Sequence, residues 1–305
     1  MRDKFSEIIF KNIKLNKKIF VVAADISPSG KMAKFQKYNE NFINVGVSEQ
    51  AMISICAGLG MSGLRPFAYT IAPFALYRPF EMVRDDICYQ NLPVTIVGMG
   101  AGTIYANLGG THTATEDISI ARSLPNMQIL SPCDTDELEQ CVNFCCTKNK
   151  SPTYLRIGKS GEKNLTANAF EKWQFGKIRK ITNGKEICII SHGPITKLAF
   201  EIKNKINKDI SIYSCHTIKP FDEKTMKKIF KKYKIIITIE DHSIIGGLSN
   251  IIKTLAYENK FHGKIIFNSL KDQFKHVYSS QEDLLEAHGI STKRIIKKMK
   301  NLNLI

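Results

Sequence analysis

Short apolar runs alternate with amphipathic stretches along the first half of the chain. Apolar runs of roughly four to eight residues between turn signals are typical of buried strands, and a period near 3.6 predicts helices. This pattern predicts strands at Ile19–Ala23, Arg65–Thr70, Val94–Gly98 and Gln128–Leu130. It predicts helices over Ser48–Met61, around Tyr77–Tyr89, and after an N-cap at Asp134 and Thr135. Strands that alternate with helices indicate parallel α/β layers.

The second half of the chain begins after a polar segment, residues 159–177, which lacks clear periodicity and is interpreted as a linker. The same alternation then returns, with strands at Ile187–Ser191, Ile210–Tyr213, Ile235–Glu240 and Lys264–Phe267. Helices are predicted over Thr196–Lys205, Glu223–Lys231 and from Leu248. We therefore expect two α/β domains, a parallel-sheet domain over residues 1–160 and a second domain over residues 165–305.

The composition excludes several classes of protein. Of the 305 residues, 43% are hydrophobic and 24% are charged, which is typical of a folded globular protein and not of a disordered one. No apolar run approaches the roughly 20 residues that a membrane-spanning helix needs. The N-terminus is charged and lacks the apolar core of a signal peptide. We therefore expect a cytoplasmic protein with no membrane partner.

Cysteines and lysines each suggest a function that their spacing does not support. Several of the eight cysteines lie within apolar stretches, and Cys141, Cys145 and Cys146 lack a usual zinc spacing, which favours buried, reduced thiols. The net charge of +16 suggests nucleic acid, but the lysines are spread out and no nucleic-acid-binding motif accompanies them. We interpret them as a solvated surface, and expect neither a nucleic-acid partner nor a metal site in this chain.

A carboxylate stands at the start of a predicted apolar helix, in the segment Asn44-Val45-Gly46-Val47-Ser48-Glu49-Gln50-Ala51. Taken alone, helix capping explains this segment. Ser48 would cap the helix, and Glu49 in the first turn would favour the positive end of the helix dipole. A functional role for Glu49 depends on the segments that follow it.

Two glycine-rich stretches follow a predicted strand, at residues 98–102 and at Gly109-Gly110-Thr111-His112. Glycines in such loops let a ligand approach the backbone closely. A lone histidine is more often packed or capping, but His112 in this loop is well placed for acid–base work. The stretch Thr70-Ile71-Ala72-Pro73-Phe74 leads into a helix, which ordinary core packing would also explain.

Taken in order, these segments resemble the transketolase family. Asn44…Glu49-Gln50, Thr70…Phe74, Gly109-Gly110-Thr111-His112 and Leu124-Pro125-Asn126-Met127…Pro132-Cys133-Asp134 are similar to its pyrimidine-binding domain, and also to 1-deoxyxylulose-5-phosphate synthase. The segments 217–222 and 240–248 resemble the family's final domain. The resemblance implies a thiamine-diphosphate-binding (pyrimidine) domain followed by a transketolase C-terminal-like domain.

The resemblance also implies roles for individual residues. Glu49 would hydrogen-bond N1′ of the aminopyrimidine ring of thiamine diphosphate and so promote its activation, and His112 would exchange protons with substrate hydroxyls. Lys159 stands where the family has a phosphate-binding arginine; it keeps the charge but loses the bidentate geometry. The other implied contacts are with the cofactor at Ile71, Phe74, Tyr77 and Asp25, and with the substrate at Ser29 and Leu108.

The Gly-Asp-Gly motif, through which the family holds the diphosphate and its divalent metal, does not occur in this chain. The resemblance therefore implies an N-terminal partner subunit that carries this motif and holds most of the Mg²⁺ or Ca²⁺ site. It also implies that the active enzyme is an α2β2 heterotetramer, in which two copies of each chain associate.

Three positions depart from the family's pattern. Leu108 replaces an aspartate that contacts a sugar hydroxyl, Thr113 replaces a glutamine, and Gly100 replaces a basic residue. An apolar side chain in place of a hydroxyl acceptor should weaken recognition of an ordinary sugar by roughly 1–3 kcal/mol. Gly100 is expected to leave more room. The expected substrate is therefore a modified sugar, for example a deoxy or nucleotide-linked one.

Three functions stay open on the sequence. The first is transfer of a two-carbon ketol unit between sugars by a split transketolase. The same plan and the same glutamate also fit the β subunit of the decarboxylating component of a 2-oxo-acid dehydrogenase, although the Gly-Gly-Thr-His loop favours transketolase. The third is a non-catalytic regulatory paralogue: intact Glu49 and His112 argue against it, whereas Leu108 and Gly100 keep it open.

Overall fold

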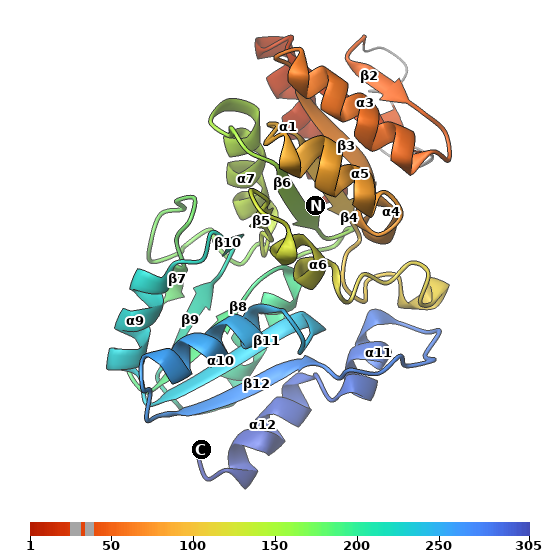
Figure 1. The fold of residues 1–305 in the computed structure, drawn as a ribbon. Helices are drawn as coiled ribbons and strands as arrows, with labels where there is room; N and C mark the ends of the chain where they lie inside the picture. The colour runs from red at the N-terminus through yellow and green to blue at the C-terminus, as the bar shows by residue number, and fades with distance from the viewer. Residues whose placement is uncertain (25–31, 34–39) are drawn as a thin grey trace.

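The computed structural model describes residues 1–24, 32–33 and 40–305, which form two sheets (Figure 1). The first sheet has the strand order β10-β5-β6-β4-β3-β1-β2, and its pairings are parallel except that of β10 with β5. Its strands are β1 (Ile19–Ala23), β2 (Phe42–Asn44), β3 (Arg65–Ile71), β4 (Thr95–Met99), β5 (Gln128–Leu130), β6 (Thr153–Ile157) and β10 (Thr217–Lys219).

Helices cover both faces of the first sheet because its strands are apolar on both sides. Successive strand residues face opposite layers, so that Val22 and Ile96 pack in one core and Val21 and Val97 in the other. The helices of the first layer are α3 (Glu49–Met61), the short α4 (Ala72–Leu76) and α5 (Phe80–Met82), a π-helical turn (Val83–Tyr89) and α6 (Asp117–Ser123). The second layer has α1 (Arg2–Leu15) and α7 (Thr135–Thr147).

The second sheet has the order β12-β11-β8-β9-β7 and is parallel except for the pairing of β7 with β9. Its strands are β7 (Arg179–Thr182), β8 (Ile187–Ser191), β9 (Ile210–Ser214), β11 (Ile235–Ser243) and β12 (Lys264–Leu270). The helices around it are α8 (Lys197–Lys205), α9 (Glu223–Lys232), α10 (Leu248–Glu258), α11 (Gln281–His288) and α12 (Thr292–Asn301). The fold is thus a two-domain α/β fold with mostly parallel sheets, as predicted.

A strand from the second half of the chain completes the first sheet. β10 lies antiparallel to β5, with Thr217 opposite Leu130. Lys219, at the end of β10, donates from Nζ to the carbonyls of Arg122 (2.9 Å) and Leu124 (2.6 Å), where α6 ends. These bonds satisfy carbonyls that a helix end leaves without partners. The two halves therefore share a sheet as well as packing against each other.

Buried hydrogen bonds also join the two halves. Arg156 in β6 pairs with Asp117 (2.8 Å) and donates to the carbonyl of Asp241 in β11 (2.7 Å). The carboxylate of Asp241 accepts from the backbone and hydroxyl of Thr103. Another arrangement of the two halves would leave buried charged groups of this network without partners, which is costly. The network therefore favours a single arrangement of the two halves.

Some elements differ from the prediction. The helix predicted around Tyr77–Tyr89 is present from Phe80, as α5 and the π-helical turn, but a break at Pro79 separates it from the short helix α4 at Ala72–Leu76. Pro79 explains the break because proline has no N–H to continue the helix. The segment 159–177 contains no helix or strand, as predicted for a linker. The pattern missed several elements: α1, β2, β6, α6, β7, β10, α11 and α12.

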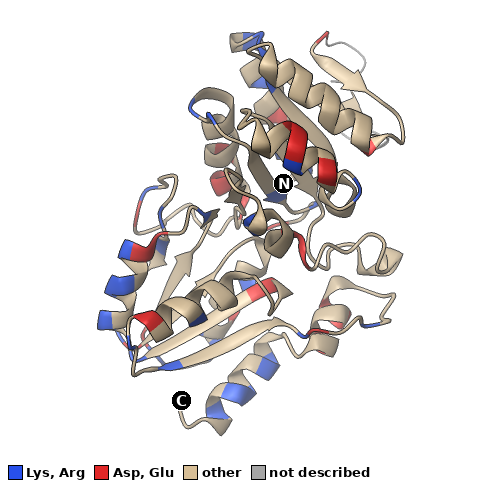
Figure 2. Ribbon diagram, viewed as in Figure 1, with Lys and Arg blue, Asp and Glu red and all other residues tan. Residues whose placement is uncertain are grey.

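The surface charge follows the helices of the second half. Lysines line the outer sides of α9 and α12, whereas α3 carries no lysine or arginine (Figure 2). The apolar side of α9, with Met226, Ile229 and Phe230, faces the core.

All eight cysteines are free and buried, as predicted, and burial raises the pKa of the Cys88 thiol to about 12. No helix in the described ranges is both long enough and apolar enough to cross a bilayer.

Candidate active site at the carboxyl edge of the first sheet

Four neighbouring parallel strands, β6, β4, β3 and β1, end at one edge of the first sheet. Open α/β sheets bind ligands in the crevice beyond such carboxyl ends. Ile71 is the last residue of β3, and Phe74, His112 and Lys159 lie in the segments that follow β3, β4 and β6. The segment after β1, with the predicted contacts Asp25 and Ser29, lies outside the described residues.

Glu49 begins α3 and is only 4% exposed. The capping explanation for this segment is wrong in one respect, because the side chain of Ser48 at the N-cap makes no capping hydrogen bond. Glu49 Oε1 instead accepts a hydrogen bond from Nη1 of Arg78 at 3.1 Å. A buried carboxylate needs such a partner, because an unpaired charge away from water is costly.

Arg78 is a site residue that the sequence analysis missed. Its guanidinium carbon lies 4.0 Å from the centroid of the Phe74 ring, while its Nη1 binds Glu49. The resemblance assigns a carboxylate and an aromatic face to an aminopyrimidine ring. In this structure the same two groups contact a planar cation that donates a hydrogen bond. The sequence does show an arginine four residues after Phe74, but the contact of this arginine with Glu49 in α3 depends on the tertiary fold.

His112 packs against Phe74 in this group. Its ring lies 5.2 Å from that of Phe74 in an edge-on arrangement. Its Nδ1 is 2.9 Å from the hydroxyl of Thr111. Phe74 therefore contacts both Arg78 and His112, so that the carboxylate of Glu49 and the imidazole of His112 belong to one cluster.

Tyr105 joins three positions that the sequence analysis treated separately. A Cβ on Gly100, where φ is +66°, would overlap the Tyr105 ring. The expectation that Gly100 leaves more room is therefore wrong, since Tyr105 fills that space. The Nζ of Lys159 lies 4.7 Å from the centroid of the same ring, and the His112 ring lies 6.4 Å from it. The Tyr105 hydroxyl is directed at Met99 Sδ (3.1 Å).

Two other predicted contacts differ in their surroundings. The Tyr77 hydroxyl donates to Glu116 Oε2 and accepts from the Glu116 backbone N–H, both at 3.2 Å. Burial, followed by the charges of Asp117 and Glu116, raises the Tyr77 pKa. Tyr77 thus anchors the loop behind His112, and its hydroxyl is not available to the group around Glu49. Leu108 is 48% exposed, at the outer side of the same loop.

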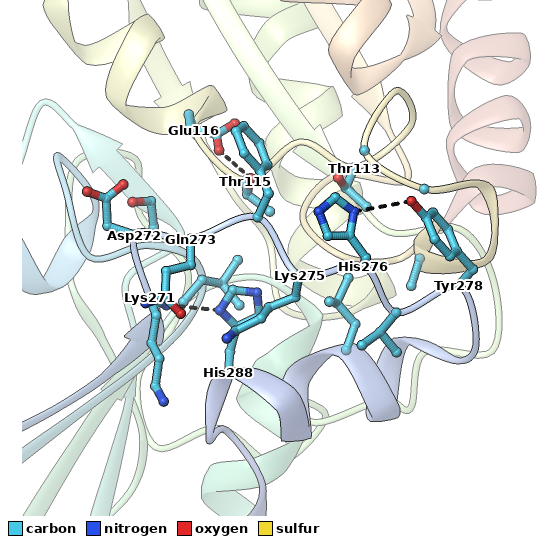
Figure 3. A pocket seen from close by; sticks show the side chains of 18 of the residues that line it. Thr113, Thr115, Glu116, Lys271, Asp272, Gln273, Lys275, His276, Tyr278 and His288 are labelled. Carbon is cyan, nitrogen blue, oxygen red and sulfur yellow. Dashed lines mark hydrogen bonds between the residues drawn. The ribbon is translucent and has the colours of Figure 1, made fainter.

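A cavity of about 520 Å³ adjoins the loop that carries His112 (Figure 3). Thr111 and Thr113, which flank His112, line one wall, and the segment 270–278 lines the other together with His288. The close-up shows the His288 imidazole pointing from α11 into this space. Within the described residues, no group of three or more His, Cys, Asp and Glu side chains is arranged to hold a metal ion.

Comparisons with known proteins identify the class. Residues 1–162 match the family model for the transketolase pyrimidine-binding domain, and residues 176–295 match that for the transketolase C-terminal domain. A Methanocaldococcus jannaschii protein described as a putative transketolase C-terminal section is 32% identical over 98% of this chain and 96% of its own length. The chain belongs to the transketolase family, a family of thiamine-diphosphate enzymes.

Individual relatives refine this picture. A structure described as a split-gene transketolase in an inactive β4 tetramer superposes with a TM-score of 0.87, at 29% identity, covering 98% of this chain and 97% of that one. One of the subunits of apulose-4-phosphate transketolase from Phocaeicola vulgatus is 27% identical over 97% of this chain and 95% of its own length. The 1-deoxy-D-xylulose-5-phosphate synthase of Clostridium tetani is 30% identical, and this chain spans 46% of its length. The chain is therefore similar to the C-terminal or β subunit of a split transketolase.

Proposed function

We propose that this chain is the C-terminal subunit of a thiamine-diphosphate-dependent transketolase that transfers a two-carbon ketol unit between sugars. A partner chain with the Gly-Asp-Gly motif would bind the diphosphate and Mg²⁺ or Ca²⁺, and two copies of each chain would form the active α2β2 enzyme. Relatives that match over nearly their whole length support a split gene, since one is named as a C-terminal section and another as one of several transketolase subunits. The proposed boundaries are residues 1–160 for the pyrimidine domain and 165–305 for the C-terminal domain.

The arrangement of Glu49, Arg78 and Phe74 is the observation that carries this proposal. The guanidinium of Arg78 is a planar group that donates to the buried carboxylate and lies over the aromatic ring. An aminopyrimidine is also planar and can present a ring N–H to a carboxylate, so Glu49, Phe74 and Ile71 fit this part of the cofactor. When bound, the cofactor supplies a nucleophilic carbon and an electron sink for cleavage beside a ketose carbonyl.

Four side chains of this chain would have separate roles in the reaction. Glu49 would hold a proton at the pyrimidine nitrogen, in a site where burial strengthens that hydrogen bond. His112, fixed against Phe74 and Thr111, would give and take protons at substrate hydroxyls. Lys159 would hold an anionic group of the substrate as a point charge. Tyr105 would keep the Lys159 ammonium in place through its ring face.

The substrate would be a modified sugar. Leu108 offers an exposed apolar side chain where the family has a hydroxyl acceptor, and Tyr105 fills the place of a second basic residue. This side of the site is consequently less polar and less positively charged than the family's pattern. A deoxy or nucleotide-linked sugar would fit it better than an ordinary pentose phosphate. A relative named for apulose 4-phosphate indicates that split transketolases of unusual substrates exist in this family.

Mutation of Glu49 tests the proposal in the enzyme assembled with its Gly-Asp-Gly partner. Glu49→Gln keeps the size of the side chain but removes the carboxylate, so ketol transfer should fall at least about 100-fold. Glu258→Gln, an exposed change at the end of α10, is the matched control and should leave the rate unchanged. Full activity in Glu49→Gln would contradict catalysis through this chain and favour a regulatory role.

A further inference from the structure

The cavity between the His112 loop and the segment 270–278 has properties that the proposed reaction does not use. Its volume of about 520 Å³ falls within the usual range for small-molecule sites. One wall comes from the first half of the chain, with Gly109, Thr111 and Thr113, and the other from the second half. Gly109 is close to the second wall, because a Cβ on it would meet the Tyr278 ring at 2.7 Å. An occupant would therefore contact both halves.

His288 supplies a fixed hydrogen-bond donor to this cavity. The side chain is 93% buried, its exposed fraction being 7%. Its Nδ1 accepts the backbone N–H of Lys271 at 3.0 Å, so a neutral imidazole must carry its proton on Nε2. Nε2 makes no hydrogen bond to any residue in the described ranges, and Figure 3 shows the ring pointing into the cavity. Nε2 therefore offers its proton to an acceptor in the cavity.

The charges around His288 favour an anionic acceptor. Lys271, Lys275 and His276 line the same wall. Burial, and then the charges of Lys275 and Lys271, lower the pKa of His288, whereas the charge of Asp241 raises it. Two carboxylates also line the cavity. That of Glu116 is already bonded to the hydroxyls of Thr115 and Tyr77, and that of Asp272 is on an exposed residue next to Lys271.

We infer that this cavity binds a small anionic metabolite through a phosphate or carboxylate oxygen, with His288 Nε2 as the donor and Lys275 as the counter-charge. The ligand would bridge the two halves and contact Thr111 and Thr113, the residues on either side of His112. The site is separate from the Lys159 position, whose ammonium lies over Tyr105. It does not depend on the proposed reaction, because every residue that forms it belongs to this chain.

Calorimetric titration of the full chain with inorganic phosphate, and separately with citrate, tests the inference. His288→Asn keeps an acceptor near the Lys271 N–H but removes the donor into the cavity, and Lys275→Ala removes the cation. Each should weaken binding about tenfold or more, since hydrogen bonds to charged groups are strong when buried. Binding of either anion supports the site, and the anion preferred identifies phosphate or carboxylate as the ligand group.

A control variant separates this site from non-specific anion binding by surface lysines. Lys297→Ala removes an exposed lysine of α12 and should bind the anions as the unmodified chain does. Lys275→Ala gives an independent answer if His288→Asn fails to fold. The inference is overturned if neither anion binds saturably, or if binding is the same in His288→Asn, Lys275→Ala and the unmodified chain.

Discussion

At the scale of single residues, the site is organised around Phe74. The guanidinium of Arg78 lies over its ring, the His112 ring packs edge-on to it, and Arg78 connects it to the buried carboxylate of Glu49. An aminopyrimidine ring and the guanidinium cannot occupy the same face of Phe74. Binding of the proposed cofactor therefore requires Arg78 to leave this position.

Replacing Arg78 should consequently strengthen cofactor binding. Arg78→Met removes the competing cation–π contact and a half-exposed ion pair, together worth roughly 1–2 kcal/mol. Calorimetry on the assembled enzyme should show thiamine diphosphate binding about tenfold more tightly. Arg84→Met, on the π-helical turn, is the control and should have no effect. Weaker binding in Arg78→Met would mean that Arg78 contacts the cofactor rather than giving way to it.

Gly100 should tolerate no side chain while Tyr105 is present. Its φ of +66° costs an L-residue about 1–2 kcal/mol, and a Cβ there would also overlap the Tyr105 ring. Gly110, in the same loop, has open space around its Cβ position. Urea unfolding should show a loss of more than about 2 kcal/mol for Gly100→Ala and less than about 1 kcal/mol for Gly110→Ala. Equal losses would mean that Tyr105 moves aside freely.

At the scale of elements, Asp134 holds α7 and the linker together. It is the N-cap of α7, as predicted, and its Oδ1 accepts the Glu137 N–H at 2.9 Å. Its Oδ2 accepts the backbone N–H groups of Leu165 (2.8 Å) and Thr166 (2.7 Å). A segment without helix or strand is thereby fixed against the first domain.

Removing this carboxylate should destabilise the whole chain. Asp134→Ala leaves the N–H groups of Glu137 and Leu165 without a partner, while that of Thr166 keeps only Asn164 Oδ1, and we expect a loss of about 2–4 kcal/mol in the free energy of unfolding. Asp136→Ala, in the first turn of the same helix, loses one exposed hydrogen bond to Asn164 and should cost less than about 1 kcal/mol. Denaturant titration of both variants measures the difference, and similar losses would contradict the role given to Asp134.

The sequence predicted elements well where an unbroken apolar run marks them. The apolar runs at Ile19–Ala23, Gln128–Leu130 and Ile187–Ser191 coincide with strands. β6 was missed because Arg156 interrupts its apolar run, and that arginine is buried only because Asp117 lies beside it in space. The pairing of β10 with β5 was likewise not predictable, since it joins residues far apart in the chain.

The site was predictable only in part. Resemblance pointed to Phe74, His112 and Lys159, and the parallel strands bring their segments to one edge. The position of Arg78 against Glu49 depends on the approach of two segments 29 residues apart. The contact between Gly100 and Tyr105 depends on the path of a loop, and no periodicity encodes it.

At the scale of the whole molecule, buried histidines make the stability depend on pH. Burial lowers the pKa of both His192 and His216 from the ordinary value of 6.5. The unfolded chain takes up protons at these groups as pH falls through 6.5, whereas the folded chain does not, so their contribution is present above pH 6.5 and lost below it. Glu240 acts in the same direction at lower pH. Burial would raise its pKa, but His192, His242 and Ser249 outweigh this and lower it to about 2.

The free energy of unfolding should therefore decrease between pH 7.5 and 5.5. Two histidines contribute at most about 2.7 kcal/mol per pH unit over this range. Urea titrations at several pH values would measure the slope, which should be smaller in a His192→Gln/His216→Gln variant even though that variant is less stable overall. His262→Gln, an exposed change, should leave the slope as it is. A slope that is unaffected by the double variant would assign the pH dependence to other groups.

The central claim is that this chain supplies the pyrimidine half of an active site divided between two chains. Calorimetric titration of thiamine diphosphate with Mg²⁺ tests it most directly, with this chain alone, with its Gly-Asp-Gly partner alone, and with the two mixed. The account predicts tight binding only in the mixture, and a marked loss when the mixture contains Glu49→Ala. Absence of binding in a mixture whose two chains are folded and associated, or binding that Glu49→Ala does not change, would contradict it.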